Sequence, residues 1–245
     1  MAQKTVPMRS RPPYSAKEII LSHLRAVALF APLRSDYLER LAERALLVRY
    51  RRGQIIHTEG EPVRGLSIVL AGMIDAVLSE ADGRQAFLSS HGPGAVIGLS
   101  DLADGRGGSA TLLAVCDCQA IRLSERDSRA LLVLDVMQAA IAREARAELA
   151  ALRENFRRLS LYSLEKRLAS YLRDRAEVSD GPEAPIPLQD SQPRIATLVH
   201  ASRTRVNITL QKWASEGEIT LERGRVTVTR SEAFWRRYDL AGTNE

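Results

Sequence analysis

Apolar residues follow two different spacings along this chain. Between about residues 48 and 123 they form short runs, such as Leu66–Leu70 and Ile74–Leu78, which glycine-containing turns separate. Runs of this length with frequent turns predict antiparallel strands in a sandwich or a small barrel. From Leu134 to Leu159 the apolar residues instead recur every three or four positions, which predicts one long helix.

The apolar stripe of this predicted helix is about 40 Å long and extends over more than three heptads. Its members are Met137, Ile141, Ala145, Leu149, Leu152, Phe156 and Leu159. Charged residues lie elsewhere around the helix, so the stripe needs an apolar partner surface. We expect it to form the dimerisation seam of a homodimer. Packing of the helix on the chain's own barrel is the alternative interpretation.

A second helical pattern near the C-terminus is interrupted by a tight turn around His200. Apolar residues recur at helical spacing on both sides of it: Ile195, Leu198 and Val199 before the turn, and Val206, Leu210 and Trp213 after it. Two short alternating patterns, residues 219–221 and 226–228, then predict strands joined at a glycine turn. Together these elements predict a winged helix-turn-helix, and a helical hairpin with another role is the alternative.

The exposed face of the second helix has the chemistry of a DNA-reading surface. No acidic residue occurs from Ser191 to Ser215, so this face can approach phosphates without like-charge repulsion. The predicted DNA-binding residues are Ser202, Arg203, Thr204, Arg205, Asn207 and Lys212 on the helix, and Arg223 and Arg225 on the wing.

Different parts of DNA suit these side chains. Arg203 fits guanine O6 and N7, Asn207 fits an adenine edge, and Thr204 or Ile208 can contact a thymine methyl group. Arg205 is expected to contact a phosphate, while Ser202 caps the helix.

Length and charge limit the remaining interpretations. The chain has 245 residues, enough for two domains, and its 35 basic and 30 acidic residues give a net charge of only +5. Affinity for nucleic acid must therefore come from local placement of charge. No apolar run of about 18 residues and no signal-peptide pattern occur, which predicts a cytoplasmic protein without a membrane partner.

We expect five segments along the chain. They are a flexible arm over 1–20, an effector domain over 21–133, the dimerisation helix and hinge over 134–162, the winged helix-turn-helix domain over 163–238, and a flexible tail over 239–245.

Two separated groups of residues share the pattern of a known family. The first group is Arg52–Ile56, Glu59–Pro62, Leu66–Gly72, Asp82–Gly83, Gly92–Gly94, Val96–Gly98 and Ser109–Ala110, and the second is Ser202–Asn207. Over about residues 25 to 230 this order resembles the Crp/Fnr family of bacterial transcription regulators.

The resemblance implies an α+β fold with an antiparallel β-barrel of the jelly-roll, or double-stranded β-helix, kind. It also implies a long dimerisation helix, a C-terminal winged helix-turn-helix, and RNA polymerase as a partner besides DNA.

The resemblance also indicates what the effector barrel lacks. Members that bind cyclic AMP place a glutamate on the ribose and, about ten residues later, an arginine on the cyclic phosphate. The matching positions here are Gly98, Leu99 and Ser100, followed by Gly108, Ser109 and Ala110. Leu99 cannot accept the ribose hydrogen bonds and Gly108 offers no cation. We therefore expect no cyclic AMP binding, with Arg106 as the one candidate substitute for the arginine.

The recognition helix departs from the family pattern as well. Arg203 keeps the first arginine, whereas Thr204 replaces a glutamate and Ile208 replaces a second arginine. The operator should therefore differ from the family's commonest half-sites. The alternative function is a small-molecule-binding or scaffold protein whose helix-turn-helix binds another protein.

Other cofactors and catalysis find little support in the sequence. Cys116 and Cys118 would share one face of a strand, where buried structural thiols are commoner than a redox pair, and two cysteines cannot hold a four-cysteine iron–sulfur cluster. His57 and His91 do not form a haem or metal pattern. No nucleophile and base pattern occurs, so we expect no enzyme. The effector, the direction of regulation and the target genes stay open.

Overall fold

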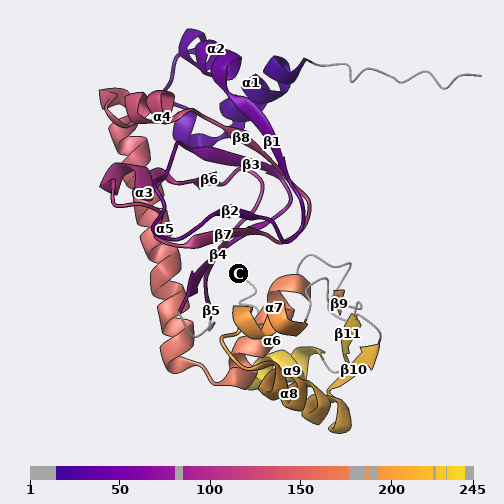
Figure 1. Cartoon of the computed structure of the whole chain (residues 1–245). Helices are drawn as coiled ribbons and strands as arrows, with labels where there is room; N and C mark the ends of the chain where they lie inside the picture. Colours follow the sequence, from indigo (N-terminus) through magenta and orange to yellow (C-terminus); the bar gives the residue numbers. More distant parts are fainter. Residues whose placement is uncertain are drawn as a thin grey trace, which may run out of the picture. The chain divides into compact units, whose positions relative to one another are not determined.

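The computed structural model describes residues 15–80, 85–176, 186–187, 192–222, 225–229 and 231–240. These residues form two compact units (Figure 1). The first consists of the described residues up to 76 together with 89–148, and the second of 77–88 together with the described residues from 149 onward. Within the described residues, no helix is long and apolar enough to cross a membrane.

Three helical segments begin the first unit. They are α1 (Ala16–Ala26), the short 3-10 helix η1 (Ala28–Phe30) and α2 (Ser35–Arg44). The Ser15 side chain accepts from the backbone N–H of Glu18, whose carboxylate accepts from the Ser15 backbone, so α1 starts with a capping box. The predicted flexible arm over 1–20 is therefore too long, because α1 already begins at Ala16.

The strands between residues 46 and 122 confirm the predicted antiparallel arrangement. One sheet has the order β1 (Leu46–Tyr50), β8 (Cys118–Arg122), β3 (Ser67–Ala71) and β6 (Val96–Ile97). The other has the order β2 (Ile55–His57), β7 (Thr111–Ala114), β4 (Ile74–Ser79) and β5 (Gln85–His91). Most of these neighbours, such as β1 and β8 or β2 and β7, are far apart in sequence, as in a jelly roll, and the two sheets do not close into a single ring.

The core of this unit has two apolar clusters. The larger joins the N-terminal helices to one sheet through buried residues such as Leu24, Phe30 and Ile68. The smaller contains Val69 and Cys118. Cys118 is buried while Cys116 is exposed. The interpretation as a buried structural thiol therefore fits Cys118. Two further helices complete the unit, α3 (Leu99–Asp104) and α4 (Glu125–Leu132).

The long helix α5 (Asp135–Leu161) has 27 residues and lies where the apolar spacing from Leu134 to Leu159 predicts a helix. The residues of its apolar stripe, however, lie in two different environments. Met137 is only 1% exposed and lies in the larger core cluster of its own chain, against which Ile141 also packs. Met137 must therefore be removed from the predicted seam. Farther along, Leu149 and Phe156 are 46% and 70% exposed.

The second unit contains the predicted winged helix-turn-helix. Its elements are α6 (Leu164–Ala176), β9 (Ile186–Pro187), α7 (Gln192–Leu198), α8 (Arg203–Ser215), β10 (Ile219–Glu222), β11 (Arg225–Val228) and α9 (Ser231–Arg237). The sheet has the order β10-β11-β9, so a strand from the proline-rich segment before α7 pairs with the wing. Trp213 and Phe234 lie in the core of this unit.

The predicted flexible tail over 239–245 begins too early. The Asp239 carboxylate pairs with Lys166 at 3.0 Å, and Leu240 packs on the core of this unit. Residues 241–245 lie outside the described residues.

Candidate nucleic-acid interface and effector pocket

The turn between α7 and α8 is held by backbone hydrogen bonds. Val199 N–H donates to Ile195 O at 2.9 Å, and Ala201 N–H donates to Ala196 O at 2.9 Å. His200 between them has a φ of 49°, a left-handed conformation that non-glycine residues adopt infrequently. The chain therefore reverses within three residues, as the sequence predicts, and α8 starts directly afterwards.

Ser202 caps α8 as predicted. Its hydroxyl accepts from the backbone N–H of Arg205 at 3.3 Å, and the first turn of the helix contains no acidic residue. No acidic side chain of this first turn therefore compensates the positive end of the helix dipole.

Burial divides α8 into two faces. Val206, Thr209, Leu210 and Trp213 are buried in the unit. The exposed residues include Arg203, Thr204, Arg205, Asn207, Ile208 and Lys212. The side chains predicted for DNA contact thus share the exposed face, together with Ile208. Arg203 is steadied by its Nε, which donates to Gln192 Oε1 at 3.1 Å.

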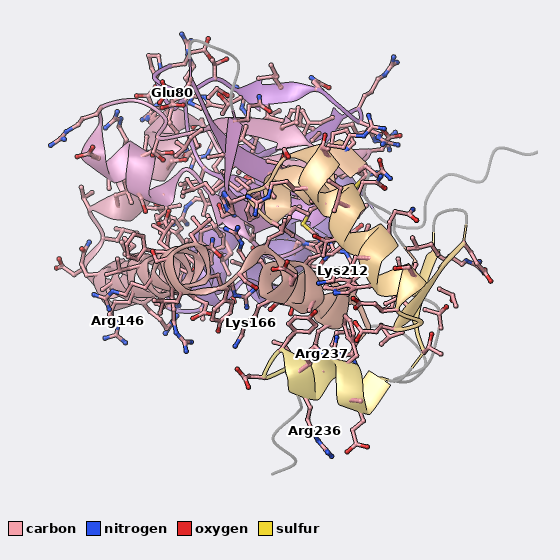
Figure 2. The ribbon with its side chains drawn as sticks, turned by 90° about the horizontal axis from the view of Figure 1, so that it is seen from below. Glu80, Arg146, Lys166, Lys212, Arg236 and Arg237 are labelled. Carbon is pink, nitrogen blue, oxygen red and sulfur yellow. The ribbon has the colours of Figure 1, made fainter. Side chains whose placement is uncertain are left out.

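The other predicted DNA contacts are placed in part. Lys212 lies near the end of α8, where Figure 2 labels it, and Arg225 is exposed at the start of β11. Arg223 lies outside the described residues. The antiparallel register of β10 and β11 pairs Glu222 with Arg225, so the predicted wing hairpin is present on both sides of its tip.

Sequence reasoning missed one cation in this unit, Arg167 on α6. Its side chain is half-buried, and its Nε is buried without a hydrogen-bond partner. Burial, followed by the nearby charge of Arg205, lowers the pKa of Arg167. Burial, followed by Arg167, also lowers the pKa of His200. An arginine within an amphipathic helix gives no signal in the sequence that would single it out.

The residues of the degenerate effector pocket are also placed. Gly98 has a φ of 89° and stands at the N-terminus of α3. Leu99 is 8% exposed and belongs to the core, and the hydroxyl of Ser100 donates to Glu148 on α5. Ser109 N–H donates to Asp101 Oδ1 at 3.0 Å, and Ala110 is buried. The pocket positions are therefore occupied by internal contacts.

Gly108 lies directly beneath the ring of His57, a contact that the sequence did not predict. A Cβ at position 108 would lie 2.0 Å from His57 Nε2, and this nitrogen is buried without a hydrogen-bond partner. Gly60 N–H donates to Gly108 O at 2.8 Å, and Gly108 N–H donates to Glu61 O at 2.9 Å. His57 thus fills the space where a side chain at position 108 would begin.

Arg106 does not take the place of the missing arginine in this structure. Its side chain is 86% exposed and its Nε pairs with Asp104 Oδ2 at 3.3 Å.

The second histidine of the barrel, His91, lies in a polar cluster. Its Nε2 is 3.0 Å from Ser89 Oγ. Burial lowers the pKa of His91, while Glu148 and the buried Asp75 oppose that shift. Among the described residues, no group of three or more His, Cys, Asp and Glu side chains is placed to hold a metal ion.

Comparison with known proteins agrees with this architecture. Residues 47–135 match the family model of the cyclic nucleotide-binding domain. The chain is 25% identical over 219 residues to the "CRP-like cAMP-activated global transcriptional regulator" of Mycobacterium tuberculosis, a match that covers 87% of this chain and 97% of that protein.

Solved structures share the fold at lower identity. A transcriptional regulator of the Crp/Fnr family from Eubacterium rectale is similar with a TM-score of 0.74 and 18% identity, covering 86% of this chain and 97% of its own. The "c-di-GMP Responsive Global Regulator CLP" of Xanthomonas campestris is similar with a TM-score of 0.67 and 21% identity, covering 80% and 99%.

Proposed function

We propose that the chain is a transcription regulator of the Crp/Fnr type, a homodimer that binds an inverted-repeat DNA operator through α8. The observation that carries the proposal is the exposed face of α8, which presents Arg203, Thr204 and Asn207 and has no acidic residue. Such a face can enter a major groove, where arginine and asparagine pair with base edges.

The base contacts follow from the side chains on this face. Arg203 would donate to guanine O6 and N7, and Asn207 would pair with adenine. Ile208 is 61% exposed, so it is available to a thymine methyl group. Arg205, Lys212 and the wing arginines would bind phosphates, which fix the position of the helix without reading sequence.

The homodimer would form through the C-terminal half of α5. Ala145, Leu149, Phe156 and Leu159 are exposed there on one stripe, and Leu152 is half-buried. A second copy of the same helix offers a matching stripe, and two recognition helices are what an inverted repeat requires.

We further propose that cyclic AMP is not the effector. Leu99 lies in the core, Gly108 carries no charge, and His57 stands over Gly108. A cyclic phosphate at this position would meet neither an arginine nor free space. The effector of the barrel would therefore be a different signal from the one named for the mycobacterial relative.

Selection of bound duplexes from a randomised pool, followed by a gel shift with and without cyclic AMP, tests these statements. We expect a recovered inverted repeat and no change on adding cyclic AMP. Recovery of no sequence would contradict the proposed function, and a calorimetric dissociation constant in the low micromolar range, about 8 kcal/mol of binding, would contradict the effector proposal alone.

The second candidate is a scaffold protein whose helix-turn-helix binds another protein. The exposed, acid-free α8 favours DNA, because a protein interface is typically depleted of charge at its centre. RNA polymerase as a partner rests on the family resemblance alone, and a regulator of this kind would act in the cytoplasm beside the chromosome.

A further inference from the structure

Arg167 on α6 is a cation without a counter-charge. It is half-buried, its Nε is buried without a hydrogen-bond partner, and no ion pair is formed by its side chain within the described residues. The two influences on its pKa are burial and the charge of Arg205, and both lower it. An arginine partly removed from water is costly unless an anion accompanies it. Arg167 therefore needs an anion, and the described residues of the chain do not supply one.

The neighbours of Arg167 belong to the helix-turn-helix. Arg205 is the third residue of α8 and is exposed, and His200 stands in the turn just before that helix. On the same helix, the pKa of Glu165 is lowered by a hydrogen bond from its own backbone, by Ser163, and by the charges of Lys212 and Arg205. Glu165 thus interacts with Arg205 and Lys212, while no carboxylate is among the influences on the pKa of Arg167.

We propose that Arg167 and Arg205 form a phosphate-binding pair, which holds one DNA backbone phosphate in each half-site between α6 and the first turn of α8. This inference rests on the proposed DNA binding and adds a contact from outside the helix-turn-helix. A guanidinium group presents parallel N–H donors that match phosphate oxygens. The N-terminus of α8 adds a favourable dipole, with no acidic side chain in its first turn.

The salt dependence of binding to a duplex selected by the wild-type protein tests the pair. Each phosphate contact contributes about 0.9 to the slope of log K against log salt, so Arg167→Gln should lower it by about 1.8 for a dimer. Lys166→Gln is the matched control, because Lys166 is the adjacent residue on α6 (Figure 2) but pairs with Asp239 at 3.0 Å. It removes the same charge and should leave the slope nearly unchanged.

Neutral methylphosphonates scanned along the same duplex locate the phosphate. One position per half-site should weaken wild-type binding, and Arg167→Gln and Arg205→Gln should both lose sensitivity at that position. Retention of the wild-type slope and scan by Arg167→Gln would overturn the pair, as would equal effects of Arg167→Gln and Lys166→Gln.

A measurement on the unaltered protein covers the case in which Arg167→Gln does not fold. The Nε–H resonance of Arg167 should shift on addition of the duplex, and that of Arg175, farther along α6, should not. An unshifted Arg167 resonance in a protein that binds the duplex overturns the pair. Failure of the wild-type protein to select any duplex would instead contradict the proposed function, so the two failures are distinct.

Discussion

At the scale of single residues, two histidines have surroundings in the fold that the sequence pattern does not indicate. His57 and His91 are isolated in the sequence, and neither belongs to a metal group in the described chain. In the fold, His57 covers Gly108, and His91 is half-buried near Asp75 and Glu148. Neither role follows from residue type, because both depend on strands that are distant in sequence.

Burial of His91 predicts a pH dependence of stability. Because its folded pKa lies below the unfolded value of about 6.5, the unfolded chain takes up a proton first as the pH falls. Stability is therefore lost as the pH decreases below that value, by at most about 1.4 kcal/mol per pH unit from this residue. Urea unfolding at about pH 7.5 and about pH 5.5 should show a smaller loss for His91→Gln. An equal loss in both proteins would contradict the prediction.

Sequence preference should depend on Arg203 and not on Arg225. If Arg203 binds a guanine, Arg203→Ala should cost about 1–3 kcal/mol and relax preference at one position in each half-site. Arg225→Ala on β11 is the comparison, since loss of a phosphate contact should weaken all sequences alike and lower the salt slope by about one per subunit. Selection from a randomised pool separates the two. Unchanged preference with Arg203→Ala would make that residue a phosphate contact.

At the scale of elements, periodic patterns located the helices well and their packing less well. The interruption near His200 placed the turn between α7 and α8 correctly, because an inner apolar face repeats on both sides of it. The stripe on α5 gave the helix but not its partners. Met137 and Leu149 look alike in the pattern, although one packs in its own core and the other is exposed. The heptad pattern cannot show which part of the stripe packs on the chain's own core and which part is left for another partner.

Helix α9 packs in the second unit, inside the domain predicted over 163–238, although no helix was predicted at this place. Phe234 and Tyr238 pack against Trp213, and Trp213 Nε1 donates to Tyr238 Oη at 2.9 Å. Arg237 also pairs with Glu218. Aromatic residues near a chain end indicate a packed segment, and this signal could have been read from Phe234, Trp235 and Tyr238.

Tyr238→Phe should therefore destabilise the second unit. The substitution removes the acceptor of the buried Trp213 Nε1–H while keeping the ring, and an unsatisfied buried donor costs about 1–3 kcal/mol. The midpoint of thermal unfolding followed by tryptophan fluorescence measures the change. Tyr37→Phe in α2 of the first unit is the matched control and should leave that transition in place. Equal midpoints for Tyr238→Phe and wild type would contradict a structural role of the hydrogen bond.

At the scale of the whole molecule, the sequence supports DNA binding as the function but does not identify the effector. The residues proposed to contact DNA are close together in the sequence, so their pattern can be recognised from the sequence alone. The effector barrel is assembled from pairings such as β1 with β8 and β3 with β6, and its interior cannot be inferred from spacing. Leu99 and Gly108 argue against cyclic AMP because they depart from a known pattern, and a departure does not identify what binds instead.

The molecule should dissociate when the exposed half of the α5 stripe is charged. Leu149→Glu combined with Phe156→Glu places four carboxylates in the proposed seam of a dimer, where like charges would be desolvated against each other. Sedimentation should then give monomers at micromolar concentration, and operator affinity should fall sharply because the two half-sites are no longer bound as a unit.

Val136→Glu is the control for that double variant. Val136 is 58% exposed on the same helix but lies outside the stripe, so its replacement should leave the dimer intact. A dimer that persists in the double variant would assign the seam elsewhere. Monomers that still bound the inverted repeat with wild-type affinity would separate dimerisation from DNA recognition, since each recognition helix would then act independently of a partner about 34 Å away along the duplex.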